Sequence, residues 1–344
     1  MKKKVIVSSS YNSNSYRVCV VIPAYNCGEV IGRTIDSVLS QTRPAQEIIV
    51  VDDGSTDDTG AEVEKFGSKV RYIAQVNAGP SAARNRGIEA AGCEWIAFLD
   101  GDDEWLPEKL EKQLGLLERH PELVWTTGNF WRCLCGTERR ACDIAPTKAK
   151  RLLGGKDFFD SYFRAYTAQA AGWTGSMLIK RSVLHEAGLF RESLNSGEDL
   201  DMWWRIAYRW PQIGYVTEPV AIYHLGTPES LSQSYFDLEL YQNLIKRHLE
   251  LSAQQNRRED FEQCAAFTIR RWIRGMLFYK RGDDIRRLME QFDQLLPEGY
   301  KKTMRILTMF PGATAGVCRA ISRVVRLFNL RRGVFRPPKK LYFI

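Results

Sequence analysis

The stretch Val18-Cys19-Val20-Val21-Ile22-Pro23-Ala24-Tyr25-Asn26 decides the fold, because an unbroken apolar run passes at once into polar residues. Such a run, rich in β-branched residues, predicts a strand that is buried on both faces of a sheet. Similar runs at 48–51, 70–73 and 95–99 predict three more strands. We therefore expect these strands to belong to one buried sheet.

Helical patterns separate the predicted strands. Apolar residues recur at helical spacing from Val30 to Leu39, and Pro80 and Pro107 stand where a helix can begin, a position that tolerates proline well. Strands that alternate with helices predict βαβ units, so the expected fold is α/β, with a mostly parallel sheet flanked by helices. In such sheets ligands bind at the carboxyl ends of the strands, which makes the residues after each strand the candidates for function.

Acidic residues follow two of the predicted strands. Asp52-Asp53-Gly54-Ser55-Thr56-Asp57 comes after the second strand, and Asp100-Gly101-Asp102-Asp103 comes after the fourth. Neighbouring carboxylates repel one another unless a cation or hydrogen bonds compensate them, and a hard divalent ion prefers oxygen ligands. The pattern predicts a Mn²⁺ or Mg²⁺ site that neutralises a diphosphate. Either motif alone could equally be a turn or a helix cap. Because both follow buried strands of the same sheet, a metal site is favoured.

Four motifs in this order make the chain resemble the inverting glycosyltransferases of family two, which have the Rossmann-like GT-A fold of the nucleotide-diphospho-sugar transferases. The resemblance is carried by 21–26, 50–57, Asn77-Ala78-Gly79-Pro80-Ser81-Ala82-Ala83-Arg84-Asn85 and 98–103. The later acceptor-side motif of the family resembles Gly197-Glu198-Asp199-Leu200-Asp201-Met202-Trp203. The resemblance implies transfer of a sugar from a nucleotide-diphosphate donor to a hydroxyl acceptor.

The resemblance also implies roles in binding the nucleoside. Pro23, Ala24 and Tyr25 would line its pocket, with the ring of Tyr25 near the base. Asp53 would accept a hydrogen bond from the imide of uracil or thymine, while Asp52 would support that loop.

The other donor-side residues of the family pattern would serve the diphosphate and the metal. Arg84 would assist donor binding. Asp102 would ligate the ion directly, and Asp100 would lie near both the ribose and the metal. Asp103 is expected to stand behind these groups or to cap a helix.

Asp199 is the expected general base. In an inverting displacement the acceptor hydroxyl attacks the anomeric carbon opposite the departing diphosphate, so a carboxylate must lie on that face. Residues 200–207 predict a helix, whose N-terminal dipole would help to keep Asp199 ionised. Without the upstream motifs, Glu198 and Asp199 would be ordinary acids of a first helical turn.

Two further candidates carry less specific signals. Trp203 could stack on a sugar face, although aromatic residues inside a helix more often belong to the core. His224 resembles a position where some relatives contact the metal or the diphosphate, but residues 225–228 depart from the common pattern. Processive relatives carry a Gln-x-x-Arg-Trp motif and membrane spans; Thr268 takes the place of that Gln before Arg271-Trp272, so a single addition is expected.

The net charge of +8 is concentrated near the C-terminus. Residues 301–344 carry eleven Lys and Arg and no Asp or Glu, which leaves about −3 for the remainder of the chain. A nucleic-acid-binding protein would be basic more evenly, so no nucleic acid is expected as a partner. Helix-spaced apolar residues among these cations suit an anionic membrane surface, although a helix packed on the enzyme with a solvated basic edge fits the same pattern.

The expected location is the cytoplasm, with peripheral binding to the cytoplasmic face of the inner membrane. The apolar run near Met1 is too short for a signal peptide, and no stretch approaches the ~20 apolar residues of a membrane span. Reduced thiols fit this location, with Cys19 as a small buried residue. Cys133, Cys135 and Cys142 lack the spacing and the histidine of a zinc site.

Three regions are expected in the 344 residues. A polar tail covers 1–17, a GT-A domain covers 18–237, and a helical, basic region covers 238–344. Within the domain, 18–125 would form the donor-nucleotide half and 126–237 the acceptor half.

The predicted function is metal-dependent, inverting transfer of one hexosyl group, with a UDP-sugar as the favoured donor. A dTDP-sugar would present the same imide edge. The acceptor would be a cell-surface glycan or a lipid-linked oligosaccharide of polysaccharide biosynthesis. A nucleotidyltransferase or dinucleotide enzyme is a weaker alternative, because no Gly-x-Gly-x-x-Gly turn follows any predicted strand. A non-catalytic sugar-nucleotide or polyanion-binding protein would need the donor residues but not Asp199.

Overall fold

The computed structural model describes residues 16–134, 140–225 and 237–318. In this part of the chain one mixed sheet runs in the order β3-β2-β1-β4-β9-β6-β10-β5, with β7 beside β6 and β8 beside β10. The strands are β1 (Val18–Ala24), β2 (Glu47–Asp52), β3 (Arg71–Ala74), β4 (Trp95–Phe98), β5 (Glu104–Trp105), β6 (Trp125–Leu134), β7 (Arg140–Cys142), β8 (Phe158–Phe159), β9 (Leu178–Lys180) and β10 (Ile213–Leu225).

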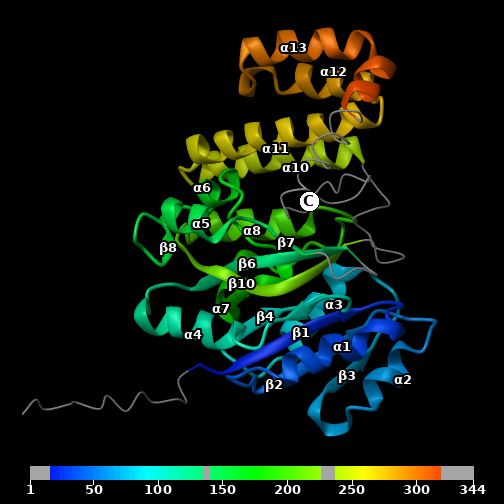
Figure 1. The fold of residues 1–344 in the computed structure, drawn as a ribbon, viewed down its shortest axis with the longest axis vertical. Coiled ribbons are helices and arrows are strands. Elements are labelled where there is room, and N and C mark those ends of the chain that lie inside the picture. Colours follow the sequence, from blue (N-terminus) through cyan, green and yellow to red (C-terminus); the bar gives the residue numbers. More distant parts are fainter. Residues whose placement is uncertain (1–15, 135–139, 226–236, 319–344) are drawn as a thin grey trace, which may run out of the picture.

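Helices flank this sheet and continue beyond it (Figure 1). They are α1 (Gly28–Leu39), α2 (Thr59–Glu64), α3 (Pro80–Ala90), α4 (Lys109–Arg119), α5 (Pro146–Leu153), α6 (Tyr162–Thr167), α7 (Arg181–Ala187), α8 (Glu198–Arg209), α10 (Leu238–Gln254), α11 (Arg258–Phe278), α12 (Gly282–Gln291) and α13 (Glu298–Met309). The helix expected to open at Pro80 is α3, and the one expected after Pro107 is α4.

The N-terminal half of the sheet is parallel, as predicted. β3, β2, β1 and β4 are parallel neighbours, and the three inner strands coincide with the apolar runs of the sequence. β9 then runs antiparallel between β4 and β6, after which β6 and β10 are parallel again. The α/β fold is confirmed, and the antiparallel pairs are confined to its second half and edges.

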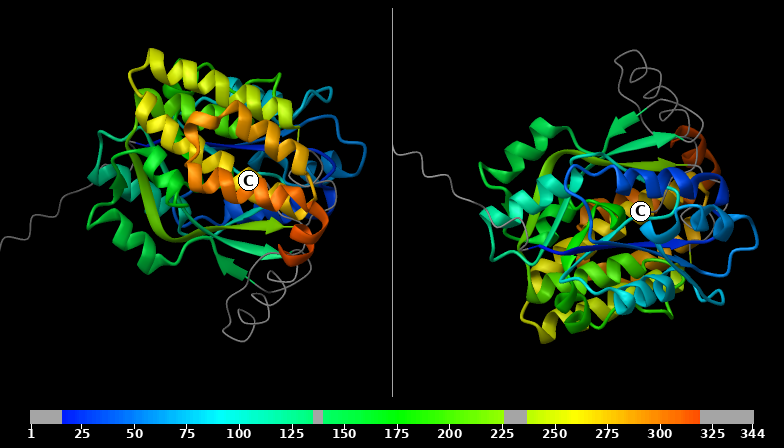
Figure 2. Two further views of the ribbon diagram at one scale, coloured as in Figure 1. Left: turned by 90° about the horizontal axis from the view of Figure 1, so that it is seen from above. Right: turned by 90° about the horizontal axis from the view of Figure 1, so that it is seen from below.

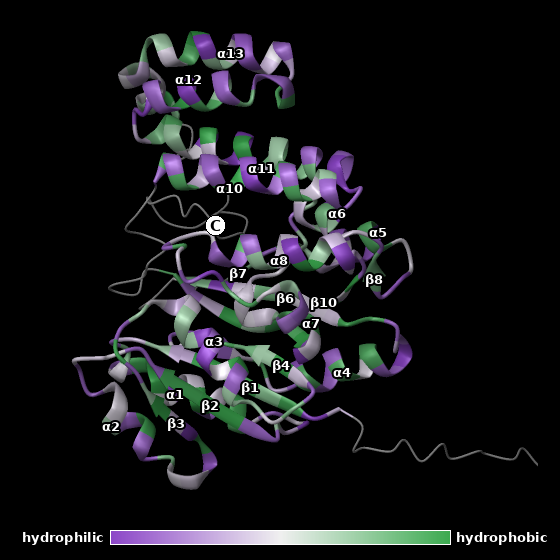
Figure 3. Cartoon of the chain, turned by 180° about the vertical axis from the view of Figure 1, so that it is seen from behind, coloured by the Kyte–Doolittle hydropathy of each residue, from purple (hydrophilic) through white to green (hydrophobic). Residues whose placement is uncertain are grey.

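Alternate residues of β1 enter two different cores. Cys19 and Val21 pack with residues of α3, α7 and α8, whereas Val18, Val20 and Ile22 pack with α1 and α4 on the other face. Each of these five side chains is at most 1% exposed. A strand covered on both faces needs apolar residues at every position, which explains the unbroken run. β1 and its neighbour β2 stand out as hydrophobic in Figure 3.

The parallel strands and α3 pack so closely that a glycine is required. A Cβ added at Gly87 would overlap the side chain of Val21 in β1. The body of α3 is thereby held against β1, and Arg84 lies three residues before Gly87 on this helix.

The C-terminal helices form a stack on one core. Tyr241 of α10 packs on Trp272 of α11 with ring centroids 4.6 Å apart, and Phe261 of α11 packs on Phe163 of α6. α12 and α13 pair with each other at the far end of this stack. Seen from above, these helices cover the middle of the molecule (Figure 2). The helical pattern predicted from residue 238 onward is confirmed as far as residue 318.

No helix in the described ranges is both long and apolar enough to span a bilayer. Most of the basic segment predicted to bind membranes, residues 319–344, lies outside the described residues, as do residues 1–15.

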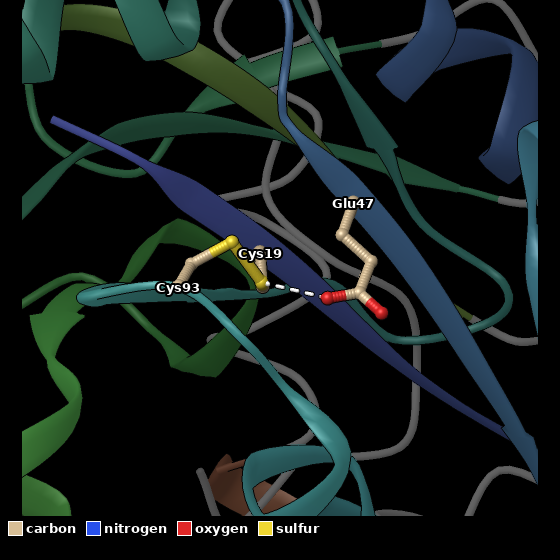
Figure 4. A group of neighbouring side chains, drawn as sticks. All are labelled: Cys19, Glu47 and Cys93. Carbon is tan, nitrogen blue, oxygen red and sulfur yellow. Dashed lines mark hydrogen bonds between the residues drawn. A yellow bond between two sulfur atoms is a disulfide. The ribbon is translucent and has the colours of Figure 1, made fainter. Parts of the chain in front are cut away.

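The expectation of reduced thiols is wrong for one pair, because Cys19 and Cys93 form a disulfide (Figure 4). Their Cα atoms lie 5.5 Å apart across 74 residues of sequence. Cys93 lies two residues before β4, which is beside β1, so the strand pairing brings the two sulfurs together. Glu47 Oε2 lies 3.1 Å from Cys19 Sγ. These three groups are the one potential metal-ligand cluster among the described residues, and in the disulfide the two sulfurs are bonded to each other.

Cys133 and Cys142, two of the three cysteines considered as zinc ligands, belong to no group of potential metal ligands within the described ranges. Cys133 is buried and Cys142 is half-buried. The Cys142 Sγ donates to the carbonyl of Ile144 and accepts from Asn129. Cys135 lies outside the described residues.

Candidate active site

The loops after β1 and β2 are joined by hydrogen bonds at the carboxyl edge of the sheet. The amide of Asn26 donates to Ser55 Oγ at 2.9 Å, and Asn26 Oδ1 accepts from the amide of Thr56 at 2.9 Å. Asn26 adopts a left-handed backbone with φ of 45°, which asparagine tolerates better than most residues. This turn leaves the ring of Tyr25 48% exposed. An exposed aromatic ring at this edge can serve as a stacking platform for a base.

The two acids at the end of β2 are almost fully buried, and the protein itself uses most of their oxygens. Asp52 accepts hydrogen bonds from the Ser55 amide at 2.9 Å and from the Tyr72 hydroxyl at 2.7 Å. These bonds tie the end of β2 to the turn that follows it and to β3.

Asp53 fixes the loop that leads into α3. Its Oδ1 accepts from Gln75 Nε2 at 2.7 Å and from the Ala78 amide at 2.9 Å, while Oδ2 accepts from the Gly79 amide at 2.8 Å. Its expected contact with a nucleobase stays a prediction. Tyr72 and Gln75 were not predicted, and nothing in their local sequence distinguishes them from other strand residues.

Arg84 connects the donor-side acids to α8. Its guanidinium is buried and binds Asp100 Oδ1 with one terminal nitrogen and Glu198 Oε1 with the other, each at 2.9 Å. It also lies over the ring of Phe190, 5.4 Å from the centroid. Burial disfavours its charge, but Asp100 and Glu198 outweigh burial and raise the pKa of Arg84. Segments 114 residues apart are thus held together by one cation.

The turn after β4 crowds three carboxyl groups. Asp100 and Asp102 are partly exposed, whereas Asp103 is buried and accepts a hydrogen bond from the His224 amide at 2.7 Å. Burial, then the charges of Asp102 and Asp100, raise the pKa of Asp103 well above its usual range. The placement of Asp103 behind the other two agrees with its expected supporting position.

The residues at this turn fit a divalent ion. Asp100 and Asp102 offer hard oxygen donors at a surface where like charges repel. In the described ranges, no three such groups around this turn lie close enough to enclose an ion by themselves. Ions such as Mg²⁺ commonly take one or two protein carboxylates and complete their shell with substrate phosphates and water.

His224 lies beside the same turn and pairs with a carboxylate. Its Nε2 lies 2.7 Å from Glu104 Oε1, and Arg33 Nε lies 3.2 Å from the same oxygen. Arg33 also donates to the carbonyl of Asp102 at 3.0 Å. Glu104 was not predicted, although it directly follows the acidic motif. The suggested contact of His224 with a metal or diphosphate stays a prediction.

Glu198 and Asp199 occupy the first turn of α8, which confirms the helix predicted over 200–207. Asp199 Oδ1 accepts from the amide of Leu200 at 2.7 Å. Burial, and then the charge of Glu198, raise the pKa of Asp199 to about 7, although Arg84 opposes this rise. The helix dipole, expected to help to keep Asp199 ionised, does not offset burial and the charge of Glu198. A base whose pKa lies near neutrality is well matched to proton abstraction at that pH.

Trp203 is a core residue and does not face a sugar. It is 2% exposed and packs against Phe98 and Phe190, with ring centroids 6.2 and 5.6 Å away. The suggestion that it stacks on substrate is therefore wrong, because α8 directs this position toward the sheet.

Known proteins are similar to this chain, some over part of the sequence and others in fold. Residues 19–186 match the family described as Glycosyl transferase family 2. YibD of Escherichia coli, named an uncharacterized glycosyltransferase, is 42% identical over 191 residues, which are 53% of this chain and 55% of YibD. TuaG of Bacillus subtilis, named for teichuronic acid biosynthesis, is 43% identical over 101 residues, covering 28% of this chain and 40% of TuaG. A Rickettsia felis glycosyltransferase is 33% identical, and the chain spans 30% of its length.

The crystal structure of TarS residues 1–349 from S. aureus, in complex with UDP-GlcNAc, superposes with a TM-score of 0.63. The two chains are 19% identical, and the alignment covers 93% of each. This likeness concerns the fold, and it shows that the sheet and its helices have the GT-A arrangement. The sequence match assigns residues 19–186, just under half of the chain, to glycosyl transferase family 2.

Proposed function

We propose that the chain is a glycosyltransferase that moves one sugar from a nucleotide-diphosphate donor, preferably a UDP-sugar, to a hydroxyl acceptor. The observation that carries this proposal is the double ion pair of Arg84 with Asp100 and Glu198. It places Asp199, the neighbour of Glu198, on the same side of the sheet as the donor-side acids. A binding protein would have no use for a second carboxylate with a pKa of about 7 at this position.

The relatives support the choice of substrate class. TarS binds UDP-GlcNAc in the crystal, which supports a UDP-sugar donor. TuaG is named for the biosynthesis of teichuronic acid, which supports a surface polysaccharide or its lipid-linked precursor as the acceptor.

The chemistry would follow from the positions of these side chains. Tyr25 stacks on the base, and Asp53 accepts from its imide. Asp199 removes the proton of the acceptor hydroxyl as that oxygen attacks the anomeric carbon and the bond to the diphosphate breaks. Attack from the side opposite the leaving group inverts the anomeric configuration. A Mn²⁺ or Mg²⁺ ion held by Asp102 and Asp100 would neutralise charge on the diphosphate.

Turnover of a panel of nucleotide sugars, with Mn²⁺, with Mg²⁺ and with EDTA, tests this function. Wild type should hydrolyse or transfer from one donor in the presence of metal. Asp102→Ala should lose metal-dependent turnover, and Asp199→Asn should bind the donor without turning it over. Asp36→Asn, an exposed acid of α1, is the matched control and should behave as wild type. Donor binding without turnover by wild type, unaffected by Asp199→Asn, would instead identify a non-catalytic sugar-nucleotide-binding protein.

We also propose that the basic C-terminal region, residues 301–344, binds an anionic membrane surface. Within its described part, Ile306, Met309 and Phe310 are 62%, 66% and 68% exposed. Ile306 and Met309 lie in the last turn of α13 and Phe310 directly follows it, and exposed apolar groups among cations suit anionic lipid. Met309→Ser with Phe310→Ser should reduce sedimentation with phosphatidylglycerol vesicles, and Tyr279→Ser, also at an exposed aromatic, should not. Equal sedimentation of all three proteins would contradict the proposal.

A further inference from the structure

The helix α10 contacts the residues on both sides of Asp199. Tyr241, Leu244 and His248 are spaced by three and four residues, so they lie on one face of this helix. All three are at most 4% exposed. This face packs against the start of α8, and α10 lies beyond the 19–186 segment that matches the family.

The first contact precedes Asp199. The hydroxyls of Tyr241 and Ser196 lie 2.7 Å apart. Gly197, the residue before α8, has a φ of 73° and lies so close to α10 that an added Cβ would be 3.3 Å from Leu244 Cδ2. The turn into α8 therefore follows the surface that α10 presents. Trp272 of α11 supports the Tyr241 ring from behind.

The second contact follows Asp199. His248 Nε2 lies 3.1 Å from Asp201 Oδ1, and both side chains are fully buried. Asp201 Oδ2 also binds Arg205 at 2.6 Å and Arg191 at 3.1 Å. Burial opposes ionisation of Asp201, but His248, Arg205 and Arg191 outweigh it and lower its pKa.

The hydrogen bonds define the state of His248. Burial lowers the pKa of this imidazole more than Asp201 raises it, which disfavours the charged ring. An ionised Asp201 can only accept, so Nε2 carries the proton that it receives. The Tyr208 hydroxyl lies 3.0 Å from Nδ1 and also donates to the carbonyl of His248 at 3.1 Å. The ring is also enclosed by Trp204 and Phe261. An N–H donor held in this way fixes the position of Asp201.

We propose that α10 is a positioning element of the active site, in which Tyr241 and His248 hold the first turn of α8 so that Asp199 is aimed at the acceptor. The proposal rests on the proposed function, since it assigns Asp199 the role of base. Small displacements of a reacting group are expensive, and about 1 Å can cost about a hundredfold in rate. Tyr241 and His248 contact Ser196 and Asp201, which lie three residues before and two residues after Asp199, so the turn between them has little freedom.

Donor hydrolysis by the full-length protein tests the proposal, with water as acceptor and the best nucleotide sugar of the panel. His248→Leu and Tyr241→Phe should each lower kcat by about tenfold to a hundredfold, with KM for the donor changed by no more than about twofold. His248→Gln retains an N–H donor and should restore most of the rate. Ile269→Ala, a cavity in α11, is the control: it should lower Tm but leave kcat unchanged.

A second readout does not depend on turnover. In protein labelled with ¹³C at the aspartate carboxyls, the signal that Asp199→Asn removes reports the pKa of Asp199. His248→Leu should move that pKa by about half a unit or more, and Ile269→Ala should not. Wild-type kcat and an unmoved pKa in His248→Leu, or the same kcat loss in Ile269→Ala, would overturn the positioning role. If wild type hydrolyses no donor, the proposed function fails, and the titration alone decides whether α10 positions Asp199.

Discussion

Replacing Asp199 by asparagine should stabilise the protein while it removes activity. The pKa of Asp199 is raised from 3.8 to about 7 by burial and by Glu198. The folded protein therefore holds a proton here more tightly than the unfolded chain does. Ionising Asp199 costs stability, and this cost appears as the pH rises from about 4 to about 7. Asparagine keeps the size of the side chain and carries no charge, so the variant escapes the cost.

The size of the effect follows from the same pKa values. Each pKa unit corresponds to about 1.4 kcal/mol, so the rise to about 7 sets an upper limit of about 4 kcal/mol at pH 8. Asp199 is partly exposed, and water screens part of that penalty, so we expect a gain of about 1–3 kcal/mol. At pH 5 wild type keeps most of the proton, and the gain should be smaller.

Urea unfolding at pH 5 and at pH 8 measures these differences, and the same helix offers the matched control. Asp201→Asn removes a charge that Arg205 and Arg191 face in the core. Because the pKa of Asp201 is lowered in the folded protein, its charge stabilises the fold above about pH 4. Asp201→Asn should therefore lower the free energy of unfolding by about 3–5 kcal/mol at both pH 5 and pH 8. If Asp199→Asn is instead less stable than wild type at pH 8, the charge of Asp199 stabilises the first turn of α8. The argument that ionising Asp199 destabilises the fold is then refuted.

Three further predictions concern the candidate site. With a base of pKa about 7, the turnover rate should rise about tenfold between pH 6 and pH 8, and a rate that is flat over this range would rule out Asp199 as the base. Tyr25→Ala should weaken UDP binding by about tenfold in calorimetry, because stacking on a base contributes about 1–3 kcal/mol. Tm should not change, because Tyr25 is exposed. Unchanged affinity for UDP would show that Tyr25 is not part of the pocket. Arg84→Met should lower the free energy of unfolding in urea by about 3–5 kcal/mol, because it leaves Asp100 and Glu198 without their shared cation. It should also move the midpoint of the pH–rate profile upward, because Arg84 lowers the pKa of Asp199. A midpoint at or below that of wild type would contradict this coupling.

Much of the fold was readable from local patterns. The apolar runs at 18–22, 48–51 and 95–99 are β1, β2 and β4, because a strand covered on both faces leaves an unbroken apolar signature. The strand at 70–73 was also found, and it forms the half-exposed edge of the sheet. β9 has only three residues and lies antiparallel between β4 and β6. A strand this short has no periodicity that would predict it from the sequence.

The sequence by itself determined which acids stand at the strand ends, and with them the family, because strand ends are local features and parallel strands share one functional edge. It could not determine which of these acids are paired or how they titrate. The link from Arg84 to Glu198, the disulfide of Cys19 with Cys93, and the contact of His248 with Asp201 join residues that are 114, 74 and 47 positions apart. Only the tertiary structure decided these pairs, because burial and charge in folded proteins depend on neighbours in space, and the distances between such groups are set by how the helices pack on the sheet.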